Sequence, residues 1–238
     1  MLPVRADRVT ISNIQGTSYV SPYLGQFVTD IEGIVTKIDS DRFYLQNPNP
    51  DDNIATSEAI VVYTKEFPRT SLGEPIAIGD RVSASGTVNE YISGAEGSNN
   101  LSQTEIDVSG NDGAVVKLSG NNPLPDAIAL SKSDRTPPDR AIDFYESLES
   151  MRVKIEDATV INPTNRYGEF IVVLQEGKPG LSEGDLNPDR LFVKIENSSP
   201  PKLQVGDRLQ GTIVGILGYD GGNYKLVTDT VPPVKPTS

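Results

Sequence analysis

The sequence predicts an all-β protein built from two five-stranded barrels, and two observations indicate this. Short runs of alternating apolar and polar residues recur along the chain, separated by turns. The 238 residues include 21 glycines and 18 prolines but no cysteine or tryptophan, a composition that favours many short strands over helices. The pattern of the first half also returns in the second half, which indicates a duplicated domain.

Five strands are expected in the first half, at residues 27–38, 42–47, 59–65, 81–91 and 103–108. The segment 66–77 leaves room for a short helix or an irregular loop between the third and fourth strands. Five strands with an insertion at that place follow the order of the oligonucleotide/oligosaccharide-binding (OB) fold. We therefore expect residues 1–119 to form a first OB-like barrel.

The second half repeats this pattern, with strands expected at residues 151–161, 169–175, 190–196, 207–217 and 224–231. Its "VGDRLQGTIVG" aligns with "IGDRVSASGTV", and the glycines of these motifs, Gly79 and Gly206, are 206 − 79 = 127 residues apart. Phe43 and Phe170 share this offset, while Glu32 and Glu156 are 124 residues apart. The near-constant offset predicts a second OB-like barrel at residues 149–231.

The remaining segments are expected to be connectors. Residues 120–148 are rich in proline and glycine and end in "AIDFYESLES", a short helix with Asp139 as its N-cap. Residues 232–238 form a proline-rich linker tail, after which we expect further protein. No apolar run approaches the roughly 20 residues of a membrane span, and residues 1–25 lack the apolar core of a signal peptide.

The charge balance argues against binding nucleic acid by phosphate neutralisation alone. The formal net charge is −12, with 8 basic and 16 acidic side chains in residues 1–119 and 13 and 17 in residues 120–238. Segment 90–112, around the expected loop between strands 4 and 5, has five acidic residues and no basic one. Binding would need a local basic face, or Ca²⁺ or Mg²⁺ that bridges to phosphate.

Several long motifs resemble a known family. They are "ISNIQGTSYVSPYLGQFVTDIEGIVTKI", "FYLQNPNPDDNIATSEAIVVY", "IGDRVSASGTVNEY", "LSQTEI" and "DFYESLESMRVKIEDATVINPTNRYGEF". Together they look like the OB-like region of bacterial extracellular nucleases that carry an endonuclease/exonuclease/phosphatase-type catalytic domain. The resemblance covers about residues 9–170 well. It implies an extracellular or cell-surface accessory module of a metal-dependent nuclease, with a C-terminal catalytic domain elsewhere; members use a catalytic histidine, and this chain has none.

The outer face of strands 2 and 3 is the expected ligand site of the first barrel, because OB barrels bind ligands there. Strand alternation turns Phe43, Leu45, Ile60 and Val62 toward the core. The residues that it turns outward are Arg42, Tyr44, Gln46, Val61, Tyr63 and Lys65. Bases stack on tyrosine rings while cations meet phosphates, so this face is a candidate platform for single-stranded DNA or RNA. Cross-strand packing of the tyrosines and cover by another domain are the alternatives.

In the second barrel, Ile171 and Val173 share the equivalent face with Arg190, Phe192 and Lys194. Aliphatic side chains suit a dry interface with another domain better than base stacking. Arg166 and Tyr167, in the loop between the first two strands, are the better ligand candidates here. Phe192 and Lys194 complete the candidate set.

A metal site is the remaining candidate. Asp51 and Asp52, with nearby asparagines, offer oxygen ligands of the kind that Ca²⁺ or Mg²⁺ prefers. The spacing does not match an EF-hand, however, and Asn and Asp also build turns without metal. We expect a turn, with a metal at Asp51 and Asp52 as the alternative.

Together these observations predict a non-catalytic module that binds or positions nucleic acid for a secreted nuclease. The alternative is a structural module that scaffolds the catalytic domain, or attaches it to a surface or carbohydrate partner, without touching nucleic acid.

Overall fold

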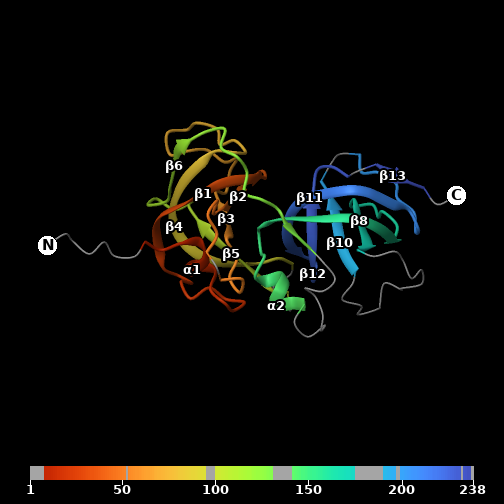
Figure 1. The fold of residues 1–238 in the computed structure, drawn as a ribbon. Coiled ribbons are helices and arrows are strands. Elements are labelled where there is room, and N and C mark those ends of the chain that lie inside the picture. The colour runs from red at the N-terminus through yellow and green to blue at the C-terminus, as the bar shows by residue number, and fades with distance from the viewer. Residues whose placement is uncertain are drawn as a thin grey trace. The chain divides into compact units, whose positions relative to one another are not determined.

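The computed structural model describes residues 8–51, 53–94, 100–130, 141–174, 190–196, 199–231 and 233–236. The chain divides into two compact units, each built on a ring of strands (Figure 1). The first comprises Met1–Ser93 and Leu101–Pro125, the second Gly94–Asn100 and Asp126–Ser238. The predicted fold class, all-β with two OB-like barrels, is confirmed.

The first unit is a closed five-stranded barrel with one additional strand. Its elements are α1 (Ile11–Gln15), β1 (Phe27–Ile38), β2 (Arg42–Gln46), β3 (Ala59–Tyr63), β4 (Arg81–Ile92), β5 (Ser102–Asp107) and β6 (Ala114–Ser119). The strands follow the order β1-β2-β3-β5-β4, β1 also pairs with β4, and β3 and β5 run parallel. This closed order is that of an OB barrel.

Alternation along the strands fills the core of this barrel, as predicted. Phe43 and Leu45 from β2 and Ile60 and Val62 from β3 have no exposed surface. They pack in one cluster with residues of the other strands, including Val82, Val88 and Ile106. These β-branched and aromatic side chains suit the pleated sheet that they stabilise.

The second unit repeats the same order with β8 (Arg152–Asn162), β9 (Glu169–Val173), β10 (Arg190–Ile195), β11 (Arg208–Asp220) and β12 (Asn223–Thr228). Its ring reads β8-β9-β10-β12-β11, is closed by pairing of β11 with β8, and has β10 and β12 parallel. Two short strands flank it: β7 (Ile128–Ala129) pairs with β8 and β13 (Val234–Lys235) with β11. The strand β13 lies within the residues that we expected to form a linker tail.

The duplication extends to individual hydrogen bonds. The Val35 amide donates to the Asp80 carbonyl and the Gly79 amide to the Val35 carbonyl; Val160 makes the same two bonds with Asp207 and Gly206. Both glycines have positive φ, 84° and 93°, a conformation that glycine adopts without strain. The two Gly-Asp-Arg motifs are therefore one loop used twice.

Glu32 and Glu156 also occupy equivalent places, although their offset is not 127. Glu32 lies opposite Ser83 and Glu156 opposite Thr212, and these partners each lie three residues before a glycine, Gly86 or Gly215, at the same point of the ring. The register shifts lie on different strands: between Val28 and Ile31 of β1, and between Leu209 and Thr212 of β11. Bulges add a residue to one strand, so a constant sequence offset cannot hold across them.

Two segments outside the strands complete the description. The segment 64–80 between β3 and β4 is irregular, with an isolated bridge between Arg69 and Pro75. The helix expected near residue 141 is α2 (Ala141–Glu146), although its proposed cap Asp139 lies outside the described residues. Where the chain is described, no helix has the length and apolar character needed to cross a membrane.

Candidate nucleic-acid interface on the outer barrel faces

The strand register brings four strands of the first barrel together on one outer face. Arg42 lies opposite Tyr63, Val61 lies beside Glu105, and Glu105 lies opposite Asn89. Their sequence neighbours Phe43, Val62 and Ile106 point into the core, so alternate residues must point outward. This face includes β2 and β3, the strands whose outer face binds ligands in OB barrels.

The centre of this face is an arginine set over two tyrosine rings. The guanidinium carbon of Arg42 is 5.6 Å from the ring centre of Tyr63 and 5.0 Å from that of Tyr91. Both distances lie within the range of a cation–π contact. Tyr91 is 44% exposed, so its ring offers surface to a ligand. We call Arg42, Tyr63, Tyr91 and Glu105 the first-barrel cluster.

The positive charge of this cluster is already compensated. The Nε and Nη2 atoms of Arg42 donate to the Asp41 carboxylate at 3.0 and 3.2 Å, and Nη1 lies 4.0 Å from Glu105 Oε2. Burial lowers the pKa of Arg42, but the hydrogen bond and charge of Asp41, with Glu105, raise it above its ordinary value. The guanidinium is therefore permanently charged, and little of that charge is available to a phosphate.

Glu105 is a carboxyl group buried on the outside of the sheet. The residue is 6% exposed, and within the described part of the chain its Oε2 atom has no hydrogen-bond partner. Burial raises the pKa of Glu105 to about 7; Arg42 opposes the shift, and the nearby charges of Asp107, Asp41 and Glu90 add to it. Such a buried, poorly paired acid is a marker of functional sites.

The other predicted residues of this face have different surroundings. Tyr44 is half-buried, and Lys37 Nζ lies 5.1 Å from its ring centre; Lys37 also pairs with Asp39. Gln46 is buried, and so is Val61. Lys65 follows β3 in a turn with a φ of 66°. Alternation therefore predicts which way these side chains leave the barrel but not whether solvent reaches them.

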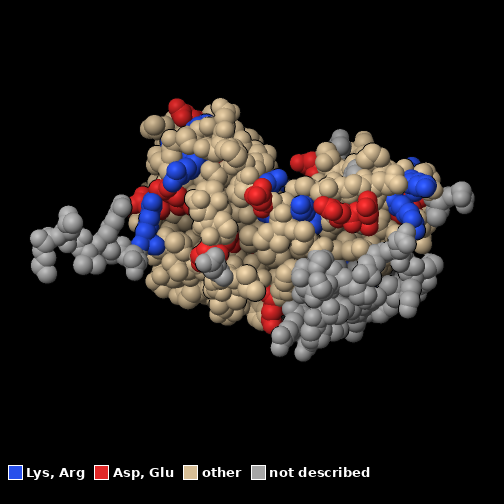
Figure 2. Space-filling model, viewed as in Figure 1, with Lys and Arg blue, Asp and Glu red and all other residues tan. Residues whose placement is uncertain are grey.

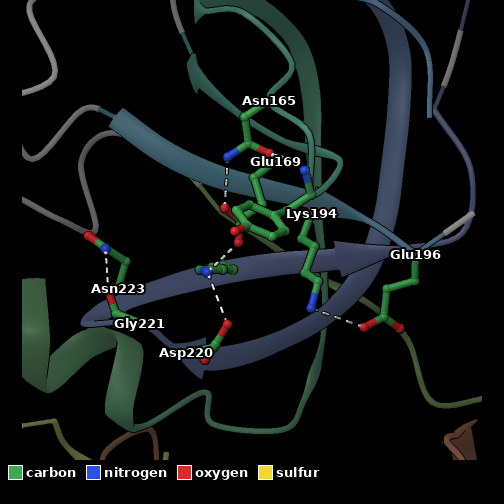
Figure 3. Close-up of polar contacts among 9 residues, drawn as sticks. Asn165, Glu169, Lys194, Glu196, Asp220, Gly221 and Asn223 are labelled. Carbon is green, nitrogen blue, oxygen red and sulfur yellow. Dashed lines mark hydrogen bonds and ion pairs between the residues drawn. The ribbon is translucent and has the colours of Figure 1, made fainter. Parts of the chain in front are cut away.

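The equivalent face of the second barrel is held together by its own charges. Lys225 Nζ lies 2.5 Å from Glu169 Oε1 and 3.3 Å from Asp220 Oδ2, and these two acids approach it from two sides (Figure 3). Asn165 Nδ2 also donates to Glu169 at 3.0 Å. Although burial raises the pKa of Glu169, the hydrogen bonds from Lys225 and Asn165 hold it below its usual value.

The predicted residues of this second face are partly covered. Ile171 and Val173 are buried. Arg190 lies 5.8 Å from the ring centre of Phe192, and Lys194 pairs with Glu196 at 3.7 Å (Figure 3). The cation–π contact of Phe192 and the ion pair of Lys194 are thus made by residues of β10 and its immediate continuation.

The loop before β9 exposes a single tyrosine. Tyr167 is 60% exposed, and its ring lies 4.6 Å from the guanidinium carbon of Arg166. The Asn165 side chain accepts hydrogen bonds from the backbone amides of Tyr167 and Glu169, which fixes the turn. These two candidates lie on a different element from Phe192 and Lys194.

The segment around Asp51 is built from repeated Asx turns. The side-chain oxygens of Asn47, Asp51 and Asn53 each accept a hydrogen bond from the amide two residues on, at 3.0, 2.8 and 3.1 Å. The second Asp51 oxygen accepts from Ser12 Oγ at 2.9 Å. One oxygen of this carboxylate therefore belongs to a turn, and the other to a long-range contact with Ser12.

The metal alternative at Asp51 and Asp52 remains a prediction. Asp52 lies outside the described residues. Over the described ranges, no group of three or more acidic side chains is arranged to hold a metal ion. A Ca²⁺ or Mg²⁺ ion at Asp51 would share its two oxygens with the hydrogen bonds that they already accept.

The distribution of surface charge agrees with the composition. On the side shown in Figure 2, lysine and arginine side chains lie close to aspartate and glutamate side chains and do not form a continuous basic area. Ion pairs explain part of this pattern: Arg8 and Arg81 both contact Glu32, at 2.7 and 2.6 Å. Phosphate attraction along such a surface is weak.

Two residues of the first-barrel cluster were missed by the sequence analysis. Tyr91 ends the alternating run of β4 and Glu105 lies in β5, and we applied alternation to strands 2 and 3 alone. Extending it to strands 4 and 5 could have placed both on the outer face. No sequence pattern could have predicted that Glu105 Oε2 lacks a hydrogen-bond partner among the described residues.

Fold and faces together define the class: an all-β protein of two tandem OB-like barrels. The chain belongs to DUF8508, a domain of unknown function, which matches residues 111–236, just over half of the 238 residues. No curated protein matches the chain.

Proposed function

We propose that this chain is a non-catalytic module that binds single-stranded nucleic acid on the outer face of its first barrel. The observation that carries the proposal is the first-barrel cluster, in which Arg42 lies over Tyr63 and Tyr91. The cluster includes residues of β2 and β3, the strands whose outer face binds ligands in OB barrels. Tyr44, also on this face, offers a further ring.

Base stacking would supply most of the affinity. Stacking of a base on an aromatic side chain contributes about 1–3 kcal/mol and tolerates any base sequence. Two cations of this face are paired with carboxylates: Arg42 with Asp41 and Lys37 with Asp39. The phosphate contribution is then small, unless Ca²⁺ or Mg²⁺ links phosphate to the acidic side chains.

The wider role follows from the resemblance to extracellular nucleases. In that role the module holds a nucleic-acid strand outside the cell while a separate metal-dependent domain hydrolyses it. The 238 residues contain no histidine, whereas the catalytic domain of the extracellular nucleases that the chain resembles uses a histidine. This difference supports a catalytic centre elsewhere.

Removing both rings tests the proposal. The probe is a fluorescently labelled oligodeoxycytidylate of about 12 nucleotides, a length within the site size of OB folds. It is titrated with the chain at low salt, and fluorescence anisotropy measures binding. We expect the Tyr63→Ala, Tyr91→Ala variant to bind at least about tenfold more weakly, because two stacking surfaces are lost. Tyr167→Ala is the matched control, since it removes an exposed tyrosine beside an arginine in the other unit, and its affinity should stay unchanged.

Two results would overturn the proposal. One is no binding by the unmodified chain at low salt, either with or without Mg²⁺ and Ca²⁺; the structural or interaction module would then be the better account. The other is binding that survives loss of both tyrosines.

A further inference from the structure

The two barrels carry an oppositely charged pair at the same place with the charges exchanged. Phe43 and Phe170 are buried at the same point of the second strand of each barrel, and Ile106 and Leu226 at the same point of the fifth. The residue before each of these points outward. In the first barrel these residues are Arg42 and Glu105, and in the second barrel they are Glu169 and Lys225.

The two charged groups are hydrogen-bonded to each other in the second barrel, which we call a closed pair, and are too far apart for a hydrogen bond in the first, which we call an open pair. Lys225 Nζ lies 2.5 Å from Glu169 Oε1, and Glu169 accepts a further bond from Asn165. Arg42 Nη1 lies 4.0 Å from Glu105 Oε2, at the limit of an ion pair and beyond hydrogen-bond length. One copy of the fold therefore satisfies its buried charge internally, whereas the other leaves a carboxylate oxygen with unused acceptor capacity.

The arginine of the first barrel is held away from this carboxylate. Its hydrogen bonds go to Asp41, the preceding residue, and its guanidinium lies over the two tyrosine rings. A buried carboxylate oxygen that accepts no hydrogen bond, as Glu105 Oε2 does among the described residues, is costly. Within the cluster, the unused acceptor thus lies beside aromatic surface, a combination that suits a flat ligand with an N–H group on its edge.

We propose that Glu105 selects the base that binds at the first-barrel cluster: its Oε2 accepts a hydrogen bond from the amino group of cytosine, adenine or guanine stacked on the tyrosines. This inference rests on the proposed function. An ionised carboxylate is an acceptor only, so it favours bases with an exocyclic amino group. Thymine is disfavoured because its single N–H lies between two carbonyl oxygens that repel the carboxylate. The closed Glu169–Lys225 pair gives the second barrel no equivalent acceptor.

Homopolymer binding tests this assignment. Labelled oligodeoxycytidylate, oligodeoxyadenylate and oligodeoxythymidylate of equal length are titrated with the full chain at low salt and above pH 7, where Glu105 is ionised. We expect the cytidine and adenine strands to bind about five- to tenfold more tightly than the thymidine strand, the usual net effect of one hydrogen bond. In Glu105→Gln the preference should fall below about twofold, because the amide both donates and accepts.

Asp107→Asn is the matched control. It removes the same charge from the same strand, two residues away, and keeps the side-chain oxygen that accepts from Ser109. The base preference of this variant should equal that of the unmodified chain. If Asp107→Asn abolished the preference as Glu105→Gln does, general electrostatics would explain it and the assignment would be wrong.

The remaining outcomes separate this inference from the proposed function. Equal binding of all three homopolymers, unchanged in Glu105→Gln, would overturn the role of Glu105 and leave single-strand binding intact. No binding of any homopolymer would overturn both.

Discussion

Glu105 shows how the surroundings of one residue set its chemistry. It lies on a strand next to Ile106. Its counterpart Lys225 has hydrogen-bonded partners, whereas Glu105 Oε2 has no hydrogen-bond partner among the described residues and lies 4.0 Å from Arg42. Burial favours the neutral acid, which raises the pKa to about 7. Near neutral pH this side chain therefore exists in both protonation states.

A stability prediction follows for Glu105→Gln. The pKa of Glu105 is about 7 in the folded chain, compared with the ordinary value of 4.5 that we take for the unfolded chain. Folding therefore takes up a proton between pH 4.5 and pH 7. Ionised Glu105 then destabilises the fold above pH 7, and this cost disappears as the pH falls toward 4.5. We expect Glu105→Gln to raise the free energy of unfolding by roughly 1–3 kcal/mol above pH 7 and to have little effect near pH 4.5.

Denaturant unfolding over a pH series measures this difference. Glu169→Gln is the matched control with the opposite sign, because hydrogen bonds from Lys225 and Asn165 hold the pKa of Glu169 below its usual value. Its carboxylate stabilises the fold above the ordinary pKa, and this contribution is lost on acidification. A Glu105→Gln chain less stable than the unmodified chain above pH 7 would contradict the account.

For single residues, the sequence predicted whether a side chain points into or out of the barrel but not what surrounds it. Alternation correctly turned Phe43 and Val62 to the core, both of which have no exposed surface. It could not foresee that Val61 is also fully buried, or that Arg42 lies over Tyr91. Burial of an outward residue depends on pairings between distant strands, and spacing along one strand carries no information about them.

At the scale of the elements, a glycine occurs at the same point of β4 and of β11. Gly86 precedes the pairing of Thr87 with Asp107, and Gly215 precedes the equivalent pairing of Ile216 with Val227. A Cβ atom on Gly86 would clash with the Asp107 carbonyl oxygen, and one on Gly215 with that of Val227. Each barrel thus needs a residue without a side chain where this long strand passes its neighbour.

We predict that Gly86→Ala and Gly215→Ala each lower the free energy of unfolding by about 1–3 kcal/mol, because the clash involves backbone atoms that cannot move aside. Gly110→Ala is the control, since open space surrounds that position and its φ is not positive. Thermal or denaturant unfolding of the three variants measures the effect. Equal stability of all three would show that the strand bends away at little cost.

The strands were the most predictable elements. The expected strand at residues 27–38 coincides with β1, and the expected β-strand positions of the second half fall on β8 to β12. Both short helices, α1 and α2, are one to two turns long, and α1 was not predicted. It depends on a local cap, Thr10, whose side chain accepts from the Asn13 amide rather than on a long periodic pattern. The two-residue strands β7 and β13 are too short to show alternation.

At the scale of the whole molecule, duplication has conserved the fold more strictly than the outer faces. Both barrels share strand order and loop hydrogen bonds, while the charged pair on the face is reversed between them. Core positions are constrained by packing, whereas outer positions can change sign without loss of the barrel. Sequence offset therefore revealed the repeat, but the different chemistry of the two faces emerged only from the distances.

The net charge of −12 limits the electrostatic attraction between this protein and the phosphates of nucleic acid. Long-range attraction is weak at this net charge, so the proposed recognition depends on the local surface of Arg42, Tyr63 and Tyr91. We propose that a single face, on the first barrel, makes the contact.

Amide chemical-shift mapping tests this claim most directly. The ¹⁵N-labelled chain is titrated with a short oligodeoxycytidylate at low salt. We expect shift changes at Arg42, Tyr63, Tyr91 and Glu105, with little change on β9, β10 and β12. No shift changes anywhere, or changes confined to the second barrel, would contradict it.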